Sequence, residues 1–189
     1  MALVFHSGFE SGNTFEWDSV TGTPTIQTTI KKTGTYAMRC NTSAATAYVS
    51  LGNTWHWSRT VYIYIASAPS AEIIIIGNSG TAAKIKLTID RYLRVYGEGD
   101  LLSITSGQLA LSTWYRVGFG RSGDVKTLYL NGVSQGSFTS SGDMPLADLG
   151  VVEAATADLY FDDYAGDSSA TTDLGDIRTL LSLPNGDGT

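Results

Sequence analysis

The sequence is dominated by short runs in which apolar and polar residues alternate, and this pattern limits most strongly how the chain can fold. In residues 84–90, KIKLTID, every second side chain is apolar. A period of two is typical of a β-strand with one face in the core and the other in solvent. Residues 60–67 and 72–76 are mostly apolar on both faces, which predicts central strands that are covered on both sides.

Turn-forming residues separate these runs at nearly regular intervals. Within residues 125–138, Asn131 and Gly132 supply the positive φ angles that a tight hairpin turn needs. The 189 residues include 21 glycines and are 16% charged, which suits strands joined by tight turns. We therefore predict an all-β fold, an antiparallel β-sandwich of the jelly-roll type, and not a parallel α/β sheet.

The last segment differs in character from the rest. We expect one sandwich domain over residues 1–167, followed by a linker and an extended arm over 168–189. The linker begins with the polar stretch SSATT, and a short helix is the alternative for the segment after it. The arm carries the apolar residues that we expect to dock on a partner: Ile177, Leu180, Leu181 and Leu183.

Charge and composition exclude several classes of partner. The formal net charge is -6, and the 12 lysines and arginines are scattered, with Lys31 and Lys32 the only adjacent pair, so no basic stripe is available to neutralise phosphates. We expect no nucleic-acid partner. The N-terminal residues lack the apolar run of a signal peptide and no later run would span a bilayer, so we expect synthesis in a cytoplasm without membrane insertion. Cys40 is the only cysteine and is interpreted as a core residue.

Two adjacent carboxylates, Asp162 and Asp163, lie within LYFDDYAGD (159–167), a run that otherwise predicts a strand. Aspartate is depleted in strands, so the pair suggests a catalytic acid and base, a cation site, or solvated side chains at a strand end. Two-carboxylate glycoside hydrolysis needs groups that face each other across about 5–9.5 Å, whereas adjacent strand residues point to opposite faces. No nucleophile elbow, phosphate loop or zinc spacing occurs, and we expect the protein not to be an enzyme.

Five segments in order resemble a known fold family. They are FHSGFESGNTFEW (5–17), KKTGTYAMRC (31–40), STWYRVGFG (112–120), LYLNGV (128–133) and LYFDDYAGD. Together they resemble the concanavalin A-like lectin/glucanase jelly roll, in its laminin-G-like and carbohydrate-binding branches. The glucanases of that superfamily carry a Glu-x-Asp-x-x-Glu strand that this sequence lacks. The resemblance therefore implies the fold more than an activity.

The same resemblance implies a structural Ca²⁺. Its ligands would be Glu10, backbone oxygens from Lys32 to Gly34, and Asp162 or Asp163. Hard oxygen ligands suit Ca²⁺, and the first and last strands of such a sandwich can lie side by side. The alternative, an aspartate that serves only the structure of a strand end, stays open.

A glycan-binding role would need aromatic rings on which sugars stack and polar side chains that fix the hydroxyl groups. The candidates are Trp55, Arg59, Tyr62, Tyr64, Tyr92 and Arg94. The alternative is that the aromatic residues fill the core, and Trp17, Trp57 and Trp114 are the tryptophans that this interpretation assigns there.

The C-terminal stretch DLGDIRTLLSLPNGDGT (173–189) resembles a segment that follows jelly-roll domains in structural proteins of tailed phages. It implies a virion protein, either a capsid decoration protein or a head or tail appendage. We expect capsid or tail proteins as partners, a homo-oligomer, binding to cell-surface glycans, and a native chain that continues past Thr189. The alternatives are a carbohydrate-binding module of a bacterial surface or polysaccharide-degrading system, and a divergent glycosidase or lyase.

Overall fold

The computed structural model describes residues 3–51, 57–77, 84–141 and 148–177 of the chain. Apart from one 3₁₀ turn, η1 (Glu98–Asp100), the regular elements in these residues are strands, which confirms the predicted all-β fold. The strands are β1 (Leu3–Ser7), β2 (Ser19–Gly22), β3 (Thr25–Gln27), β4 (Ala37–Ser50), β5 (Ser58–Ser67), β6 (Ile73–Ile76), β7 (Lys84–Leu87), β8 (Tyr92–Tyr96), β9 (Leu102–Gln108), β10 (Trp114–Ser122), β11 (Val125–Leu130), β12 (Val133–Thr139) and β13 (Asp148–Asp167). None of the described residues forms a helix long and apolar enough to cross a membrane.

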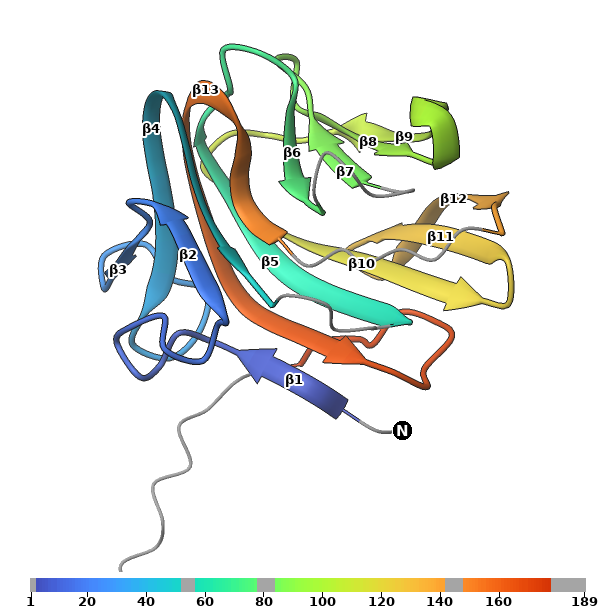
Figure 1. The fold of residues 1–189 in the computed structure, drawn as a ribbon, viewed down its shortest axis with the longest axis horizontal. Helices are drawn as coiled ribbons and strands as arrows, with labels where there is room; N and C mark the ends of the chain where they lie inside the picture. Colours follow the sequence, from blue (N-terminus) through green and yellow to red (C-terminus); the bar gives the residue numbers. More distant parts are fainter. Residues whose placement is uncertain (1–2, 52–56, 78–83, 142–147, 178–189) are drawn as a thin grey trace, which may run out of the picture.

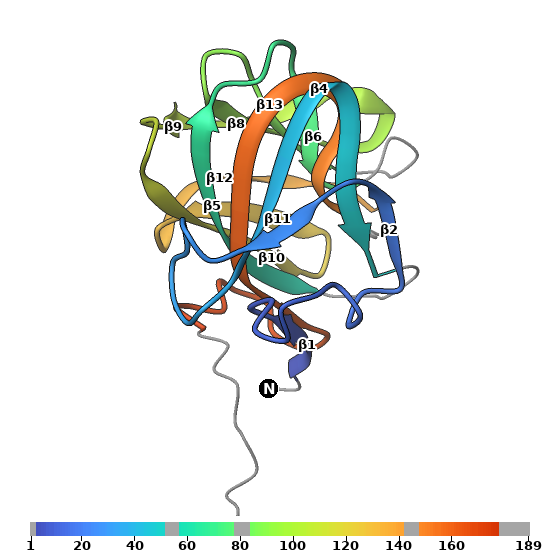
Figure 2. The same cartoon turned by 90° about the vertical axis from the view of Figure 1, so that its left-hand side faces the viewer.

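The strands form two antiparallel layers that share their longest members (Figure 1). The first layer has the order β12-β11-β10-β5-β13-β4-β3, and the second has the order β9-β8-β7-β6-β13-β4-β2. Strand β1 pairs with the C-terminal end of β13. Figure 2 shows β4 and β13 side by side, each bending from one layer into the other. The predicted antiparallel jelly-roll sandwich is therefore confirmed.

The shared strands can change layers because their pairing is irregular in the middle. The register between β13 and β4 shifts between Val151 and Ala157. Gly150 has a φ of 138°, and Ala44 in β4 has a φ of 52°. Extra residues and positive φ angles of this kind bend a strand and increase its twist, which turns the corner of a sandwich.

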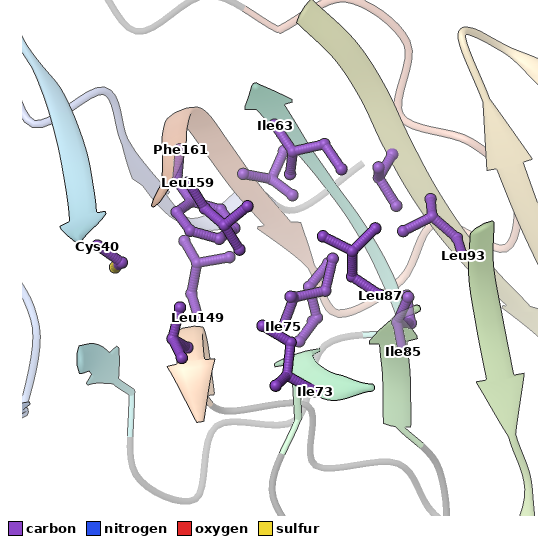
Figure 3. Packing of buried hydrophobic residues seen from close by; sticks show 14 of the residues in the cluster. Cys40, Ile63, Ile73, Ile75, Ile85, Leu87, Leu93, Leu149, Leu159 and Phe161 are labelled. Atoms are coloured by element: carbon purple, nitrogen blue, oxygen red, sulfur yellow. The ribbon is translucent and has the colours of Figure 1, made fainter. Parts of the chain in front are cut away.

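The core lies between the two layers and is built from the apolar half of the alternating pattern (Figure 3). Ile63 and Phe161 from the first layer are buried, as are Ile85 and Leu87 from the second. All four residues of β6 are buried, as the doubly apolar run predicted. The expectation for residues 84–90 was wrong at Ile89, which is 53% exposed because β7 ends at Leu87 and the chain turns there. It was also wrong at Lys84 and Thr88, which were expected to face solvent but are buried.

Cys40 lies in the same core. Its side chain is fully buried, as the sequence interpretation expected. Burial raises the pKa of its thiol to about 12, so the reactive thiolate is strongly disfavoured.

Replacing Gly150 by alanine should destabilise the fold by about 2–4 kcal/mol. A Cβ atom there would lie 2.5 Å from the carbonyl oxygen of Ala47 and 2.7 Å from the Cα of Tyr48, in a backbone conformation that alanine rarely adopts. The control is Gly107→Ala, because a Cβ at Gly107 meets nothing within 4 Å. Urea unfolding of both variants would measure the difference, and equal midpoints would show that the bend tolerates a side chain.

Candidate functional site

The outer face of the first layer carries a row of aromatic side chains. Tyr160 of β13 pairs with Tyr64 of β5, which in turn pairs with Trp114 of β10. On the far side, Tyr160 pairs with Arg39 of β4. The next residues along β5 and β13, Ile63 and Phe161, are buried in the core, so strand alternation directs the row outward.

The rings of this row contact one another. The ring centroids of Tyr64 and Trp114 are 5.4 Å apart, and those of Tyr64 and Tyr160 are 5.7 Å apart at 85°. Tyr64 and Trp114 are half-buried, whereas Tyr160 is 5% exposed and supports Tyr64 edge-on. We call Tyr160, Tyr64 and Trp114 the aromatic row.

A charged pair closes one end of the aromatic row. The guanidinium of Arg39 lies 5.4 Å from the ring centroid of Tyr160 and donates two hydrogen bonds of 2.8 Å to Asp158. The hydrogen bonds to Asp158 raise the pKa of Arg39. Rings and a fixed ion pair on one face can stack on a sugar and bind its hydroxyl groups.

A second outward row lies beside the first. Here Tyr62 of β5 pairs with Asp162 on one side and with Arg116 on the other. The amine of Lys32 lies 4.8 Å above the ring of Tyr62, whose hydroxyl donates a 2.7 Å hydrogen bond to Asp176. Burial and the bond to Asp176 raise the pKa of Tyr62 to about 12. The sequence proposed Tyr62 as a stacking ring, but the structure shows it 8% exposed and covered.

The chain after β13 folds back onto this face. We call residues 168–177 the strap. The hydroxyl of Ser58 donates a 2.7 Å hydrogen bond to the carbonyl of Ala170, and Asp173 forms an ion pair with Arg116. We expected residues 168–189 to leave the sandwich as an arm, but the described part packs on its own domain. Of the predicted docking residues, Ile177 is half-buried, and Leu180, Leu181 and Leu183 lie outside the described residues.

The residues predicted to hold Ca²⁺ gather around the turn at residues 31–36. Both carboxylate oxygens of Glu10 accept the backbone N–H of Thr35 at 2.9–3.0 Å, and one also accepts the N–H of Tyr36 at 3.1 Å. A Cβ atom at Gly34, which has a φ of 57°, would overlap the Glu10 carboxylate. A side chain there would displace the Glu10 carboxylate and strain the backbone, so the turn favours glycine.

Asp162 and Asp163 bind the same turn from the other side. One oxygen of Asp162 accepts the N–H groups of Lys32 and Thr33 at 2.8 and 3.2 Å, and Asp163 accepts the hydroxyl of Thr33 at 2.7 Å. Within the described part of the chain, no group of three or more His, Cys, Asp and Glu side chains could hold a metal ion. The carboxylates meet N–H donors where a calcium site would need carbonyl oxygens, so this arrangement does not fit Ca²⁺. Calcium binding stays a prediction.

The other residues proposed for glycan binding are dispersed. Tyr92 and Arg94 lie on the outer face of the second layer, where Arg94 pairs with Glu72. Arg59 is buried, and Trp55 lies outside the described residues. Of the set, only Tyr64 belongs to the aromatic row.

Four residues of the site formed by the aromatic row and its charged pair were not among the sequence candidates: Arg39, Asp158, Tyr160 and Trp114. Trp114 was assigned to the core but is half-buried, and Trp57 is 40% exposed, whereas Trp17 is 5% exposed as that interpretation expects. The residues are widely separated in sequence and meet only through strand register, so no local motif marked them.

A separate pocket opens between η1, β9 and β12. Its volume is about 430 Å³, and it is lined by Gly97, Leu101, Ser103, Phe138, Thr139, Ser140 and Ser141. It presents hydroxyl groups and one aromatic ring but no charged side chain. The pocket lies at the edge where β12 approaches β9, apart from the aromatic row.

Comparisons with known proteins bear on the fold. No protein-family model and no curated protein sequence matches the chain. The sialidase of Trypanosoma rangeli in complex with sialic acid matches with a TM-score of 0.56 and 12% identity, over 75% of this chain and 26% of that chain. The HCR/D W1238A mutant matches with a TM-score of 0.58 and 15% identity, over 80% of this chain and 43% of that chain. The chain thus spans less than half of either neighbour, and the likeness shows the fold alone.

These matches correct the expectation that the protein is not an enzyme. That expectation rested on the absence of catalytic motifs from the sequence. The Trypanosoma rangeli neighbours are sialidases, which are enzymes, and the matched region is 26% of their length. A domain of this fold therefore occurs inside an enzyme, and the expectation is overturned, although the likeness assigns no activity to this chain.

Asp162 should make the stability of the fold depend on pH. Burial and the charge of Asp163 raise the pKa of Asp162 to about 7, against the N–H bonds that favour the charged form. The pKa of Asp162 is higher in the folded than in the unfolded state, so its protonation stabilises the fold. This stabilisation is fully present below about pH 4 and is lost as the pH rises through about 7. Over this range the free energy of unfolding should fall by at most about 1.4 kcal/mol per pH unit.

Thermal melting of the protein and of Asp162→Asn across this range would measure the effect. The wild-type melting temperature should fall more steeply with rising pH than that of the variant, and parallel curves would contradict the shift. The same melts with Ca²⁺ and with a chelator test the calcium prediction, which identical curves would overturn.

Proposed function

We propose that this chain is a glycan-binding domain of the concanavalin A-like class and a structural component of a tailed-phage virion. The observation that carries the glycan-binding part is the aromatic row with the Arg39–Asp158 pair at its end. Tyr64 and Trp114 present half-buried rings on the outer face of a sheet, which is held rigid from behind by the core.

The chemistry of the row suits sugars. A pyranose ring has an apolar face that packs on an aromatic ring and hydroxyl groups at its rim that need hydrogen-bond partners. Tyr64 and Trp114 offer neighbouring rings, and the paired Arg39 and Asp158 offer a fixed donor and acceptor. Because Tyr160 holds Tyr64 edge-on, little side-chain freedom is lost on binding.

Support for the virion part comes from the sequence. Residues 173–189 resemble the segment that follows jelly-roll domains in tailed-phage structural proteins. Under this proposal the partners are capsid or tail proteins and further copies of the chain, and the bound glycan belongs to the surface of the host cell.

A carbohydrate-binding module of a bacterial surface or polysaccharide-degrading system is the second candidate. The observation that favours it is the match to sialidases, in which a region of this fold accounts for 26% of the chain. Both candidates use the aromatic row, and they differ in what the domain is attached to.

Replacing Trp114 by alanine should weaken glycan binding by about tenfold, because one of the two half-buried rings is lost. Trp57→Ala is the matched control, since Trp57 is the more exposed tryptophan and lies outside the row. A glycan array would identify the ligand, and calorimetric titration would give the affinities. The proposal fails if Trp114→Ala binds as the wild type does, or if no glycan binds the wild type.

The protein should co-sediment with phage particles when it is produced during infection. Particles purified on a density gradient and probed with an antibody against the domain would show it. Its recovery instead from the bacterial surface or from a secreted polysaccharide-degrading fraction would favour the second candidate.

A further inference from the structure

Arg116 lies between the aromatic row and the strap and contacts the strap directly. It is the next outward residue after Trp114 on β10, and it pairs with Tyr62 on β5. Its Nη1 atom lies 2.8 Å from one carboxylate oxygen of Asp173 and 2.9 Å from the other. The two side chains are 12% and 14% exposed, so the strap buries a guanidinium directly beside the stacking rings.

Strand β10 has glycines where the strap packs against it. Gly118 and Gly120 lie on the same face of β10, and a Cβ at Gly118 would lie 2.5 Å from Asp173, while one at Gly120 would lie 3.1 Å from Thr172. Glycine inside a strand weakens the strand and often marks the close approach of another chain segment. The sequence of β10 therefore leaves room for the strap beside Arg116.

The strap is held on the sheet by side-chain contacts and not by strand pairing. None of residues 168–177 belongs to a strand, and the described attachments to the sheet include the side chains of Ser58, Tyr62 and Arg116. Two of these contacts use strap carboxylates, from Asp173 and Asp176. If the strap moved away, Arg116 and Lys32 would remain on a face that had lost those two negative charges.

We propose that Arg116 is the subsite for the carboxylate of an acidic sugar, and that Asp173 occupies this subsite in its absence. The inference rests on the proposed glycan-binding function and names the class of ligand. Sugar rings stack on Tyr64 and Trp114, and a uronic or other carboxylate-bearing residue at the end of the stack binds Arg116 in place of Asp173. An arginine fork suits this role because it binds a carboxylate through parallel hydrogen bonds.

Asp173 acts as a tethered competitor in this arrangement. A group held on the same chain has an effective concentration of about millimolar, so it lowers the apparent affinity for a free ligand without being consumed. The tether also makes the subsite selective, since a neutral sugar gains nothing by displacing the strap and only a carboxylate replaces the lost ion pair.

The test uses the full chain and a matched pair of ligands, a short oligouronate and the same oligosaccharide with its carboxyl groups reduced to alcohols. Asp173→Asn keeps the shape of the side chain and removes its charge, and it should bind the oligouronate about tenfold more tightly than the wild type. Its affinity for the reduced ligand should not change. Arg116→Gln should bind both ligands equally, and thermal melting confirms that each variant is folded.

Each outcome decides between distinct conclusions. Unchanged oligouronate affinity in Asp173→Asn, or equal gains for both ligands, would overturn the carboxylate subsite while leaving glycan binding intact. No binding of either ligand by any variant, together with an empty glycan array, would overturn the proposed function itself. If a peptide that copies residues 170–176 binds Asp173→Asn and the oligouronate does not, the surface under the strap recognises peptides and the assignment to sugars is wrong. If Arg116→Gln does not fold, the Asp173→Asn comparison and its dependence on salt decide the question alone, because ion pairing weakens as salt rises.

Discussion

The pairing of β13 with β4 is the constraint on which the rest of the structure depends. The two strands pair from Asp148 with Ser50 to Phe161 with Met38, across the corner at which both change layers. The C-terminal half of β13 then pairs with β5, and its N-terminal end pairs with β6 through Leu149 and Ile76, so both sheets are assembled on this pair of strands. The same half that pairs with β5 carries the aromatic Tyr160 and the carboxylates that bind the turn at residues 31–36. The site and the fold therefore share one scaffold.

Local sequence pattern predicted the parts of the fold that depend on local physics. Alternation placed Ile85 and Leu87 in the core and failed at Ile89, because a pattern continues past the residue at which a strand ends. The candidate site could not be predicted in this way, because strand register, and not a local pattern, brings its residues together. Arg39 and Trp114 are 75 residues apart in the sequence, and they share a row because β4, β13, β5 and β10 pair in one particular alignment. A shift of one residue in any of these pairings would turn the side chains of that strand to the other face.

The acidic residues near the turn show a second limit of sequence reasoning. Glu10, Asp162 and Asp163 were interpreted as ligands for Ca²⁺ because a resemblance placed them near a turn, and the structure does bring them to one turn. Whether such carboxylates bind a cation or backbone N–H groups depends on which way the peptide units of the turn face. That orientation is a property of the φ and ψ angles, such as the positive φ of Gly34, and not of residue types. The same residues at the same spacing are compatible with both outcomes.

The strap explains how the guanidinium of Arg116 can lie beside the aromatic row while mostly shielded from water, because the carboxylate of Asp173 balances its charge. Removing one partner of a buried ion pair costs about 3–5 kcal/mol when nothing replaces it, since the remaining charge has lost its hydration. Arg116 and Asp173 are 12% and 14% exposed, so water can reach part of the pair and the cost of separating them is lower than that of a fully buried pair. Asp173 can leave Arg116 at little cost only when water or another carboxylate takes its place. A carboxylate on a sugar that already stacks on Trp114 loses less freedom when it binds Arg116. The glycines of β10 bring the strap, and with it Asp173, close to Arg116 and the neighbouring ring of Trp114. Under the proposed carboxylate subsite, this ion pair would determine which class of sugar the aromatic row binds.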